Sequence, residues 1–359
     1  MFVLSLIFGV FALIGALDRI TGNHLKLGEE FEKGIMSAGT LALAMVGMIA
    51  IAPTLSKLLI PVLSPVSEFL HIDPSFIGGF IANDMGGASV AQQLSTDPVL
   101  GGYHGLVVAS MMGVTISFTV PVALKTIDSR FHKDVLNGIL CGIATIPFGC
   151  VVSGLVLRLP LGVLMLNLLP VIVVALITCI GLVFKPELCR KIFTIIGHLI
   201  LIIITVGLAA GIFEHIVGIK LIPFLEPVSV GFEVVCGIAI ILAGVFPLIS
   251  VLSRVFKKPF AALGKLIKIN DASVMGIISS LANSIPTFSL VEKMNSKGIV
   301  MNMAFAVSAS FVLGDHLAFT MEFNSDYLLA MIIGKLSGGV CAMIAAHFLC
   351  AYNEKKRSV

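Results

Sequence analysis

Charged residues are scarce in this sequence. Only 12% of its 359 residues are Asp, Glu, Lys or Arg, whereas 58% are hydrophobic. Soluble domains carry about 25% charged residues, and a soluble core cannot absorb this much apolar surface. The composition therefore excludes an ordinary soluble domain and predicts an all-α polytopic membrane protein.

Several motifs of known chemistry are also missing. Tryptophan is absent and tyrosine occurs three times, so the aromatic residues that usually mark membrane interfaces are few. The seven cysteines, an odd number, fall mostly in apolar segments and argue against a disulfide framework. Histidines and cysteines show no metal-ligand spacing, and there is no Gly-x-x-x-x-Gly-Lys-Ser/Thr phosphate loop. We therefore expect no metal, no cofactor and no ATPase domain in this chain. Its basic residues lie mainly in loops and at the C-terminus, which gives no support to nucleic-acid binding.

Apolar runs of about 20 residues, long enough to span a bilayer, recur along the whole chain. The predicted spans are residues 2–18, 35–56, 105–124, 135–157, 161–184, 192–213, 233–253, 299–320 and 328–350. The first run has no basic region before it and no small-residue cleavage site after it, so it is predicted to be a membrane helix and not a signal peptide.

Two further apolar segments, residues 73–96 and 271–292, are interrupted by polar residues. The first contains Asn83-Asp84 followed by two glycines, and the second contains Asn283 in an Ala-Asn-Ser-Ile-Pro stretch. Paired interruptions at matching places in two halves of a chain suggest a binding site between the halves. Amphipathic stretches precede both segments, at residues 57–71 and 254–268, and we expect them at the membrane interface.

The second half of the chain repeats the first. Pro53 pairs with Pro247, Asn83 with Asn283, and the stretch Gly113–Phe118 with Ala306–Phe311, at offsets of 193 to 200 residues. The predicted organisation is repeat unit A at 1–158, a linking transmembrane helix at 161–184, repeat unit B at 192–350 and a cytoplasmic tail at 351–359.

The distribution of Lys and Arg predicts how the segments are threaded. If both interrupted segments cross the membrane, the chain makes eleven crossings and the basic residues divide almost evenly between the two sides. If both segments enter and return as re-entrant segments, Lys57, Arg158 and Lys220 lie on one side and 19 basic residues on the other. The positive-inside rule favours this second arrangement, an inverted-topology repeat with about nine full crossings. It places the N-terminus outside and the C-terminus in the cytoplasm; eleven crossings remain the alternative.

Two carboxylates lie deep in apolar segments, Asp84 in residues 73–96 and Asp315 in residues 299–320. An ionised carboxylate inside a bilayer costs several kcal/mol, so each should face a cavity or a partner. Lys335 in the last span is the obvious partner in a structural ion pair. If it balances one carboxylate, the other leaves a net negative charge that attracts a cation.

Uncharged polar residues lie at the two breaks and on the spans that follow them. At the breaks, the side chains of Asn83 and Asn283 and the unwound backbone can accept hydrogen bonds. The predicted substrate contacts on the following spans are Thr115, Ser117, Asn302 and Ser308, with Gln92 and His316 as supporting residues. Serine and threonine in membrane helices usually pack or bond their own i−4 carbonyl, so we expect only part of this set to touch a substrate. His316 is a candidate proton relay beside Asp315, although isolated membrane histidines more often serve packing.

A series of motifs runs in order along nearly the whole chain. They are residues 39–48, Asp84–Gly87, Ala282–Pro286, Ala304–Ala309, Leu313–Leu317 and Gly334–Leu336. Together they resemble the ethanolamine utilisation permease family (EutH). The resemblance implies uptake of ethanolamine across the bacterial inner membrane, which feeds a cobalamin-dependent ammonia-lyase pathway in a microcompartment. It assigns no site residues, so the set above rests on the physical argument alone.

Ethanolamine fits the polar residues of the two breaks. It is a small ammonium cation with a hydroxyl, and a buried carboxylate can hold the ammonium while Asn or Ser binds the hydroxyl. We expect alternating access or facilitated diffusion at a midplane site. The alternatives are a channel-like facilitator, a proton- or sodium-coupled carrier of another small amine, and a membrane-embedded enzyme that uses Asp84 and Asp315. A homodimer is compatible with the sequence, which carries no signal that demands one.

Overall fold

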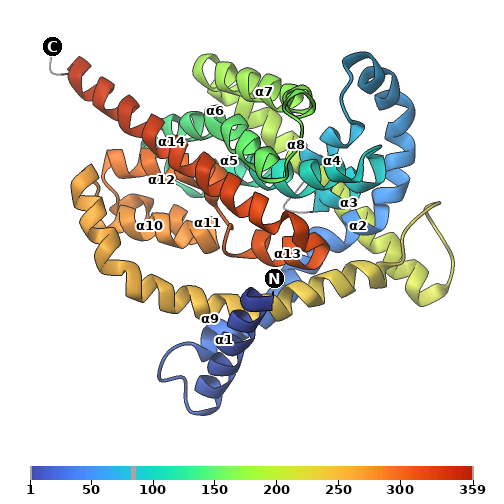
Figure 1. Ribbon diagram of the computed structural model, residues 1–359, viewed down its shortest axis with the longest axis horizontal. Coiled ribbons are helices and arrows are strands. Elements are labelled where there is room, and N and C mark those ends of the chain that lie inside the picture. Colours follow the sequence, from blue (N-terminus) through green and yellow to red (C-terminus); the bar gives the residue numbers. More distant parts are fainter. Residues whose placement is uncertain (1, 82–85, 358–359) are drawn as a thin grey trace.

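The computed structural model describes residues 2–81 and 86–357, and every regular element in this part is a helix (Figure 1). Within it, eight helices are long and apolar enough to span a membrane. They are α1 (Phe2–Ile20), α2 (Gly28–Leu70), the run Pro98–Thr126, α6 (His132–Val156), α7 (Leu161–Phe184), α8 (Pro186–Val217), α9 (Val228–Ile267) and α14 (Leu328–Arg357). The prediction of an all-α polytopic membrane protein is confirmed.

Shorter helices build the rest of the described chain. The run Pro98–Thr126 consists of α4 (Pro98–Gly102), the π-helical turns η3 (Tyr103–Gly113) and η4 (Thr115–Thr119), and α5 (Val120–Thr126). The other short helices are η1 (Pro74–Gly79), α3 (Gly87–Leu94), η5 (Ser129–Phe131), α10 (Asp271–Ala282), α11 (Ser284–Leu290), η6 (Val291–Lys293), α12 (Ser296–Ala309), α13 (Asp315–Asn324) and η7 (Ser325–Tyr327). Wide π turns recur at functional sites, and here they occupy the middle of a buried span.

Two very long helices, α2 and α9, pack along each other. They have 43 and 40 residues, so each is about 60 Å long or more, twice the thickness of a bilayer core. In each, a predicted span and the amphipathic stretch after it form one continuous helix that passes through internal prolines. In Figure 1, α9 runs below the bundle formed by α10, α12 and α14.

The first helix of each half packs on the long helix of the other half: α1 on α9, and α8 on α2. Both contacts are made at a glycine. Gly244 of α9 lies against the carbonyl of Phe8, and Gly47 of α2 lies against the carbonyl of Ile204, so closely that neither position has room for a Cβ. Gly47 and Gly244 are 197 residues apart, within the range of 193 to 200 residues that separates paired positions in the sequence repeat. In both the α1–α9 and the α8–α2 contact, therefore, a glycine of the long helix packs against a backbone carbonyl of the other helix.

The structure differs from the sequence prediction at residues 299–320, where one continuous span was expected. Helix α12 ends at Ala309 and α13 begins at Asp315, and the five residues between them are not α-helical. The N–H groups of Phe311 and Leu313 donate instead to the carbonyls of Ser280 and Leu281 at the end of α10, both at 2.9 Å. Phe311 takes a left-handed backbone conformation (φ 64°), which is unusual for a bulky residue and is held here by this pairing.

The two ends of segment 73–96 lie next to each other. η1 packs against α3, and the buried carboxylate of Asp73 joins the two ends of the segment. It accepts hydrogen bonds from the N–H groups of Ser75 (2.9 Å), Thr96 (2.9 Å) and Asp97 (3.2 Å), and from the Thr96 hydroxyl (2.7 Å).

Segment 271–292 is closed in a similar way, and α10 packs against α11. The Asn270 side chain donates to the carbonyl of Lys293 (2.7 Å), and the Asn295 side chain donates to the carbonyl of Lys268 (3.1 Å). Both interrupted segments are therefore hairpins whose ends are tied together.

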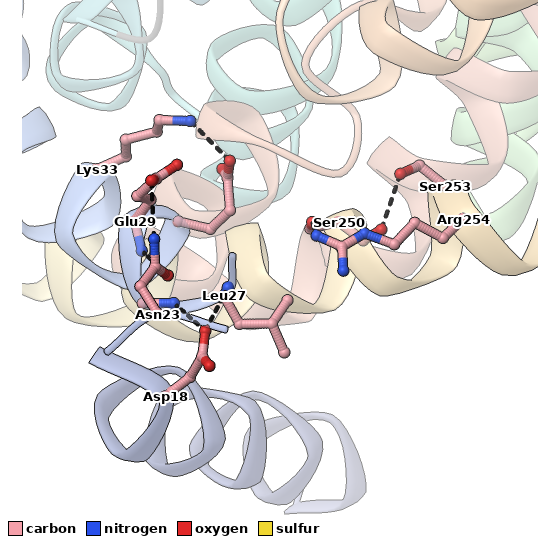
Figure 2. A network of polar contacts seen from close by, with 10 residues as sticks. Asp18, Asn23, Leu27, Glu29, Lys33, Ser250, Ser253 and Arg254 are labelled. Atoms are coloured by element: carbon pink, nitrogen blue, oxygen red, sulfur yellow. Dashed lines mark hydrogen bonds and ion pairs between the residues drawn. The ribbon is translucent and has the colours of Figure 1, made fainter. Parts of the chain in front are cut away.

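Asp18 holds the turn between α1 and α2, and its bond to Leu27 is seen in Figure 2. The Asp18 carboxylate accepts hydrogen bonds from the N–H groups of Leu25 (2.9 Å), Leu27 (2.8 Å) and Gly28 (3.1 Å), and so satisfies donors at the start of α2. From α9, the Arg254 guanidinium donates to the carbonyl of Leu25 at 2.7 Å. The α1–α2 turn and the second half of α9 consequently lie on one side of the molecule.

Candidate functional site

Two chain breaks cross at the centre of the candidate site. One is at Asn283, between α10 and α11; the other is the stretch 310–314, between α12 and α13. Gly314 packs directly on the carbonyl of Ala282, so the residues that follow these two, Asp315 and Asn283, are brought to the same crossing. Asn283 caps α11, its side-chain oxygen accepting the N–H of Ile285 at 2.9 Å.

The π-helical part of the first half lies against this crossing. The Thr115 hydroxyl donates to its own helix at Met111 (2.6 Å) and also reaches the carbonyl of Val307 on α12 (3.1 Å). The rings of Phe118 and Phe311 meet edge to face, with centroids 5.8 Å apart. The span that carries the predicted residue Thr115 is thus in contact with α12 and with the break at 310–314.

Three serine hydroxyls at or next to the breaks are buried and have no hydrogen-bond partner among the described residues: Ser284, Ser308 and Ser310. Helical serines in membranes usually bond their own i−4 carbonyl, as Ser337 does on α14 (2.6 Å to the carbonyl of Ile333). Ser308 lies within α12 against Gly338 of α14 and makes no such bond, while Ser284 begins α11 and Ser310 follows the end of α12. Of these, Ser308 is among the substrate contacts predicted from the sequence.

Lys335 and His316 are fully buried beside the crossing. The Lys335 ammonium donates to the carbonyl of Ser110 in η3, and so joins the last helix of the chain to the π-helical span. The His316 ring packs on Phe311 with centroids 5.1 Å apart, which agrees with a packing role; its role as a proton relay stays a prediction. Asp315 opens α13 and is only partly buried.

Helix ends of both signs meet at the crossing. Helices α10 and α12 end there and α11 and α13 begin there, and the carbonyls of Ser280 and Leu281 are already bonded by Phe311 and Leu313, so the helix termini favour neither charge. Asp315 adds a carboxylate at the same place. Groups of three His, Cys, Asp or Glu side chains that would hold a metal ion are not found within residues 2–81 and 86–357.

Three predicted residues lie apart from the crossing or are bonded elsewhere. Asn302 ties α12 to α10 by donating to the carbonyls of Ser273 (2.9 Å) and Gly298 (2.8 Å). Gln92 is exposed on α3 and lines a separate cavity of about 120 Å³ with Tyr327. The Ser117 hydroxyl donates to its own i−4 carbonyl, that of Gly113, at 2.8 Å. Asn83 and Asp84, which the sequence argument placed at the first break, lie outside the described residues.

Four polar residues near the first hairpin were not predicted from the sequence. The buried His104 ring lies 2.7 Å from the Ser75 hydroxyl, and the Asn167 side chain accepts the N–H of Asp73 at 2.8 Å. Burial raises the pKa of the Asp73 carboxyl, but hydrogen bonds from Ser75 and Thr96 outweigh this and hold the pKa below its ordinary value. The signal in the sequence was the Asp-Pro-Ser start of η1, a helix-capping pattern.

Comparison with known proteins identifies the family to which this chain belongs. Residues 2–349 match the family described as "Ethanolamine utilisation protein, EutH". A Listeria monocytogenes protein named "Probable ethanolamine permease EutH" is 45% identical over 348 residues, which cover 97% of this chain and 93% of that protein. A protein of the same name from Escherichia coli is 39% identical, with 94% and 93% of the two chains covered. The uncharacterized protein YxeR of Bacillus subtilis is 38% identical, with 98% and 95% covered. No solved structure matches the chain. By its match over nearly the full length and its identity to these relatives, the chain belongs to the EutH family of ethanolamine utilisation proteins.

Proposed function

We propose that this protein takes up ethanolamine, as the ethanolammonium cation, at the crossing of its two chain breaks. The family and the names of the relatives support ethanolamine as the substrate. The observation that carries the location is the trio of buried hydroxyls at Ser284, Ser308 and Ser310, without partners in the described part of the chain. A buried polar group without a hydrogen bond costs about 1–3 kcal/mol, and a bound amino alcohol offsets that cost by pairing with it.

The ammonium group binds where negative charge gathers. Asp315 and the Asp84 carboxylate (predicted from the sequence alone) supply that charge in this proposal. The substrate hydroxyl pairs with serine. Lys335 balances part of the negative charge and holds α14 against the π-helical span, so it acts as a supporting residue.

We also propose the re-entrant arrangement, with nine crossings, the N-terminus outside and the C-terminus in the cytoplasm of the bacterial cell. Three contacts support it. Arg254 bonds the carbonyl of Leu25, Arg130 pairs with Glu292 (3.3 Å), and Lys57 lies over the ring of Phe224 (3.2 Å to its centroid). With eleven crossings, the two members of each pair would be on opposite sides of the membrane. With two re-entrant hairpins they share a side, inside for the first two pairs and outside for the third.

The test is uptake of labelled ethanolamine into proteoliposomes at acidic pH, where the neutral amine that diffuses unaided is scarce. The variants are Asp84→Asn, Asp315→Asn and a triple Ser284→Ala, Ser308→Ala, Ser310→Ala substitution. Ser337→Ala, whose hydroxyl bonds its own helix, is the matched control. We expect uptake to be lost in the three site variants and kept in the control. Normal uptake in the triple variant would place the site elsewhere, and no uptake by the unaltered protein would reject the function.

The same vesicles distinguish the modes of transport. A carrier that works by alternating access gives saturable uptake and counterflow, whereas a channel gives neither. Imposed pH, sodium and voltage gradients identify the coupling ion. A membrane-embedded enzyme would instead release product without transfer of ethanolamine across the bilayer.

A further inference from the structure

A second polar cavity, of about 390 Å³, lies at the foot of the first hairpin. It is formed where α2 ends, where the segment 73–96 starts and ends, and where α7 begins. Polar residues in its wall include Ser67, Glu68, His71, Asp73, Thr96 and Asn167. In the proposed topology this cavity opens on the outer side, whereas the crossing of the breaks lies deep in the protein.

The cavity carries negative charge. Glu68 and Asp73 both line it, and no Lys or Arg is among its described lining residues. Helix α2 ends beside it at His71, and η1 and α7 begin there, so helix termini of both signs meet and the net charge comes from the two carboxylates. A small cation is the ligand that this potential attracts.

The two carboxylates have different tasks. Asp73 is buried and already accepts four hydrogen bonds from the two ends of the hairpin, so it contributes charge from the floor of the cavity. Glu68 is exposed and makes no ion pair or side-chain hydrogen bond within the described chain. Its carboxylate is therefore available to an ammonium group.

Ser67 gives a second and independent indication of a ligand. Its side chain lines the cavity, the residue is only 6% exposed, and its hydroxyl has no partner among the described residues. The common alternative for a helical serine, a bond to the carbonyl four residues earlier, is not made. A polar group of a bound molecule would satisfy it.

From these observations we infer that the cavity is a second binding site, which takes a small primary ammonium ion at the outer face. Glu68 pairs with the ammonium, Ser67 bonds the hydroxyl of the same molecule, and Asp73 supplies charge from below. The identity of the ligand, ethanolammonium, rests on the proposed function, while the site itself rests on the cavity. An exposed ion pair is weak, so this site captures the cation loosely before it reaches the crossing.

Equilibrium dialysis of labelled ethanolamine tests this with the full chain in phosphatidylcholine nanodiscs. The unaltered protein should bind two molecules per chain, and Glu68→Gln or Ser67→Ala should bind one. In proteoliposomes the same two variants should raise the KM for uptake about two- to fivefold and leave the maximal rate unchanged. Glu226→Gln, an acidic residue of the loop before α9 outside the cavity, is the matched control and should change neither quantity.

The outcomes separate the two proposals. Two bound molecules and a normal KM in both Glu68→Gln and Ser67→Ala would overturn the outer site while leaving transport intact. Glu68-dependent binding without any uptake by the unaltered protein would reject the proposed function and keep the site. Should Glu68→Gln fail to fold, Ser67→Ala removes a single oxygen and decides alone. Nanodiscs that contain phosphatidylethanolamine show whether a lipid headgroup supplies the same ammonium: free ethanolamine would then be displaced from this site only.

Discussion

Phe118 of the first half and Phe311 of the second half meet edge to face, with ring centroids 5.8 Å apart and planes at 73°. The repeat in the sequence aligns these two residues with each other. Equivalent positions of two units touch when both lie near the axis that relates the units, as in a two-fold interface. This contact, together with the matching glycine contacts at Gly47 and Gly244, supports the proposed inverted repeat and places the candidate site near its axis.

The first prediction concerns this aromatic pair. Phe118→Leu and Phe311→Leu should each lower the free energy of unfolding, and together they should lower it by about 1 kcal/mol less than the sum, because the first substitution already removes the ring contact. The chain has no tryptophan, so unfolding is best followed in a background that keeps only the buried Cys150 of the seven cysteines, with a thiol-reactive dye that reports its exposure. Strict additivity would show that the two rings do not interact.

Of the two chain breaks at the candidate site, the one at Asn283 could be predicted from the sequence and the one at 310–314 could not, for a physical reason. A polar residue within an apolar run is costly and therefore visible, which is why the break at Asn283 could be predicted. The polar residues around the break at 310–314, such as Asp315, were visible, but the loss of helix was not, because its cause is backbone pairing with Ser280 and Leu281, about 30 residues away along the chain. Single-sequence patterns do not contain such a contact. For the same reason, the wide π turns next to Thr115 were not predicted.

The second prediction concerns the Asp73 clamp at the first hairpin. Asp73→Asn should lower the free energy of unfolding by about 2–3 kcal/mol at neutral pH, since hydrogen bonds to a charged acceptor are replaced by poorer ones. The pKa of this carboxyl is lowered in the folded protein, so its contribution is complete above the ordinary pKa of about 3.9 and is lost as the pH falls through the folded value. The difference between the proteins should therefore be constant from about pH 5 to 7 and shrink below about pH 4. A difference that grows in acid would contradict this account.

The third prediction concerns topology. In a cysteine-free background that retains uptake, Lys57→Cys and Lys220→Cys should both react with a membrane-impermeant maleimide in whole cells. Arg130→Cys and Lys265→Cys should react only after lysis, because the re-entrant arrangement places them inside. All four side chains are exposed in the structure. The eleven-crossing arrangement puts Lys57 and Lys220 on opposite sides, so labelling of only one of that pair from outside would reject the re-entrant hairpins.

The fourth prediction concerns Lys335. Lys335→Met keeps the aliphatic stem of a fully buried side chain and removes the ammonium that bonds the carbonyl of Ser110. We expect a loss of about 2–3 kcal/mol in the free energy of unfolding, because a buried acceptor loses a charged donor. The exposed Lys293→Met is the control and should change the free energy by less than about 0.5 kcal/mol. Equal effects of the two variants would remove Lys335 from the structural role assigned to it.

The fifth prediction compares Thr115 with Ser117, two hydroxyls that are two residues apart on the same π-helical span. Thr115 reaches across to the carbonyl of Val307, whereas Ser117 bonds only within its own span. Thr115→Val should therefore cost about 1 kcal/mol of stability and reduce uptake of ethanolamine, because it loosens the contact between the two halves at the crossing. Ser117→Ala should leave both nearly unchanged. If Ser117→Ala instead abolishes uptake in a protein that unfolds normally, its hydroxyl leaves the Gly113 carbonyl during transport and binds the substrate, as its place in the sequence first suggested.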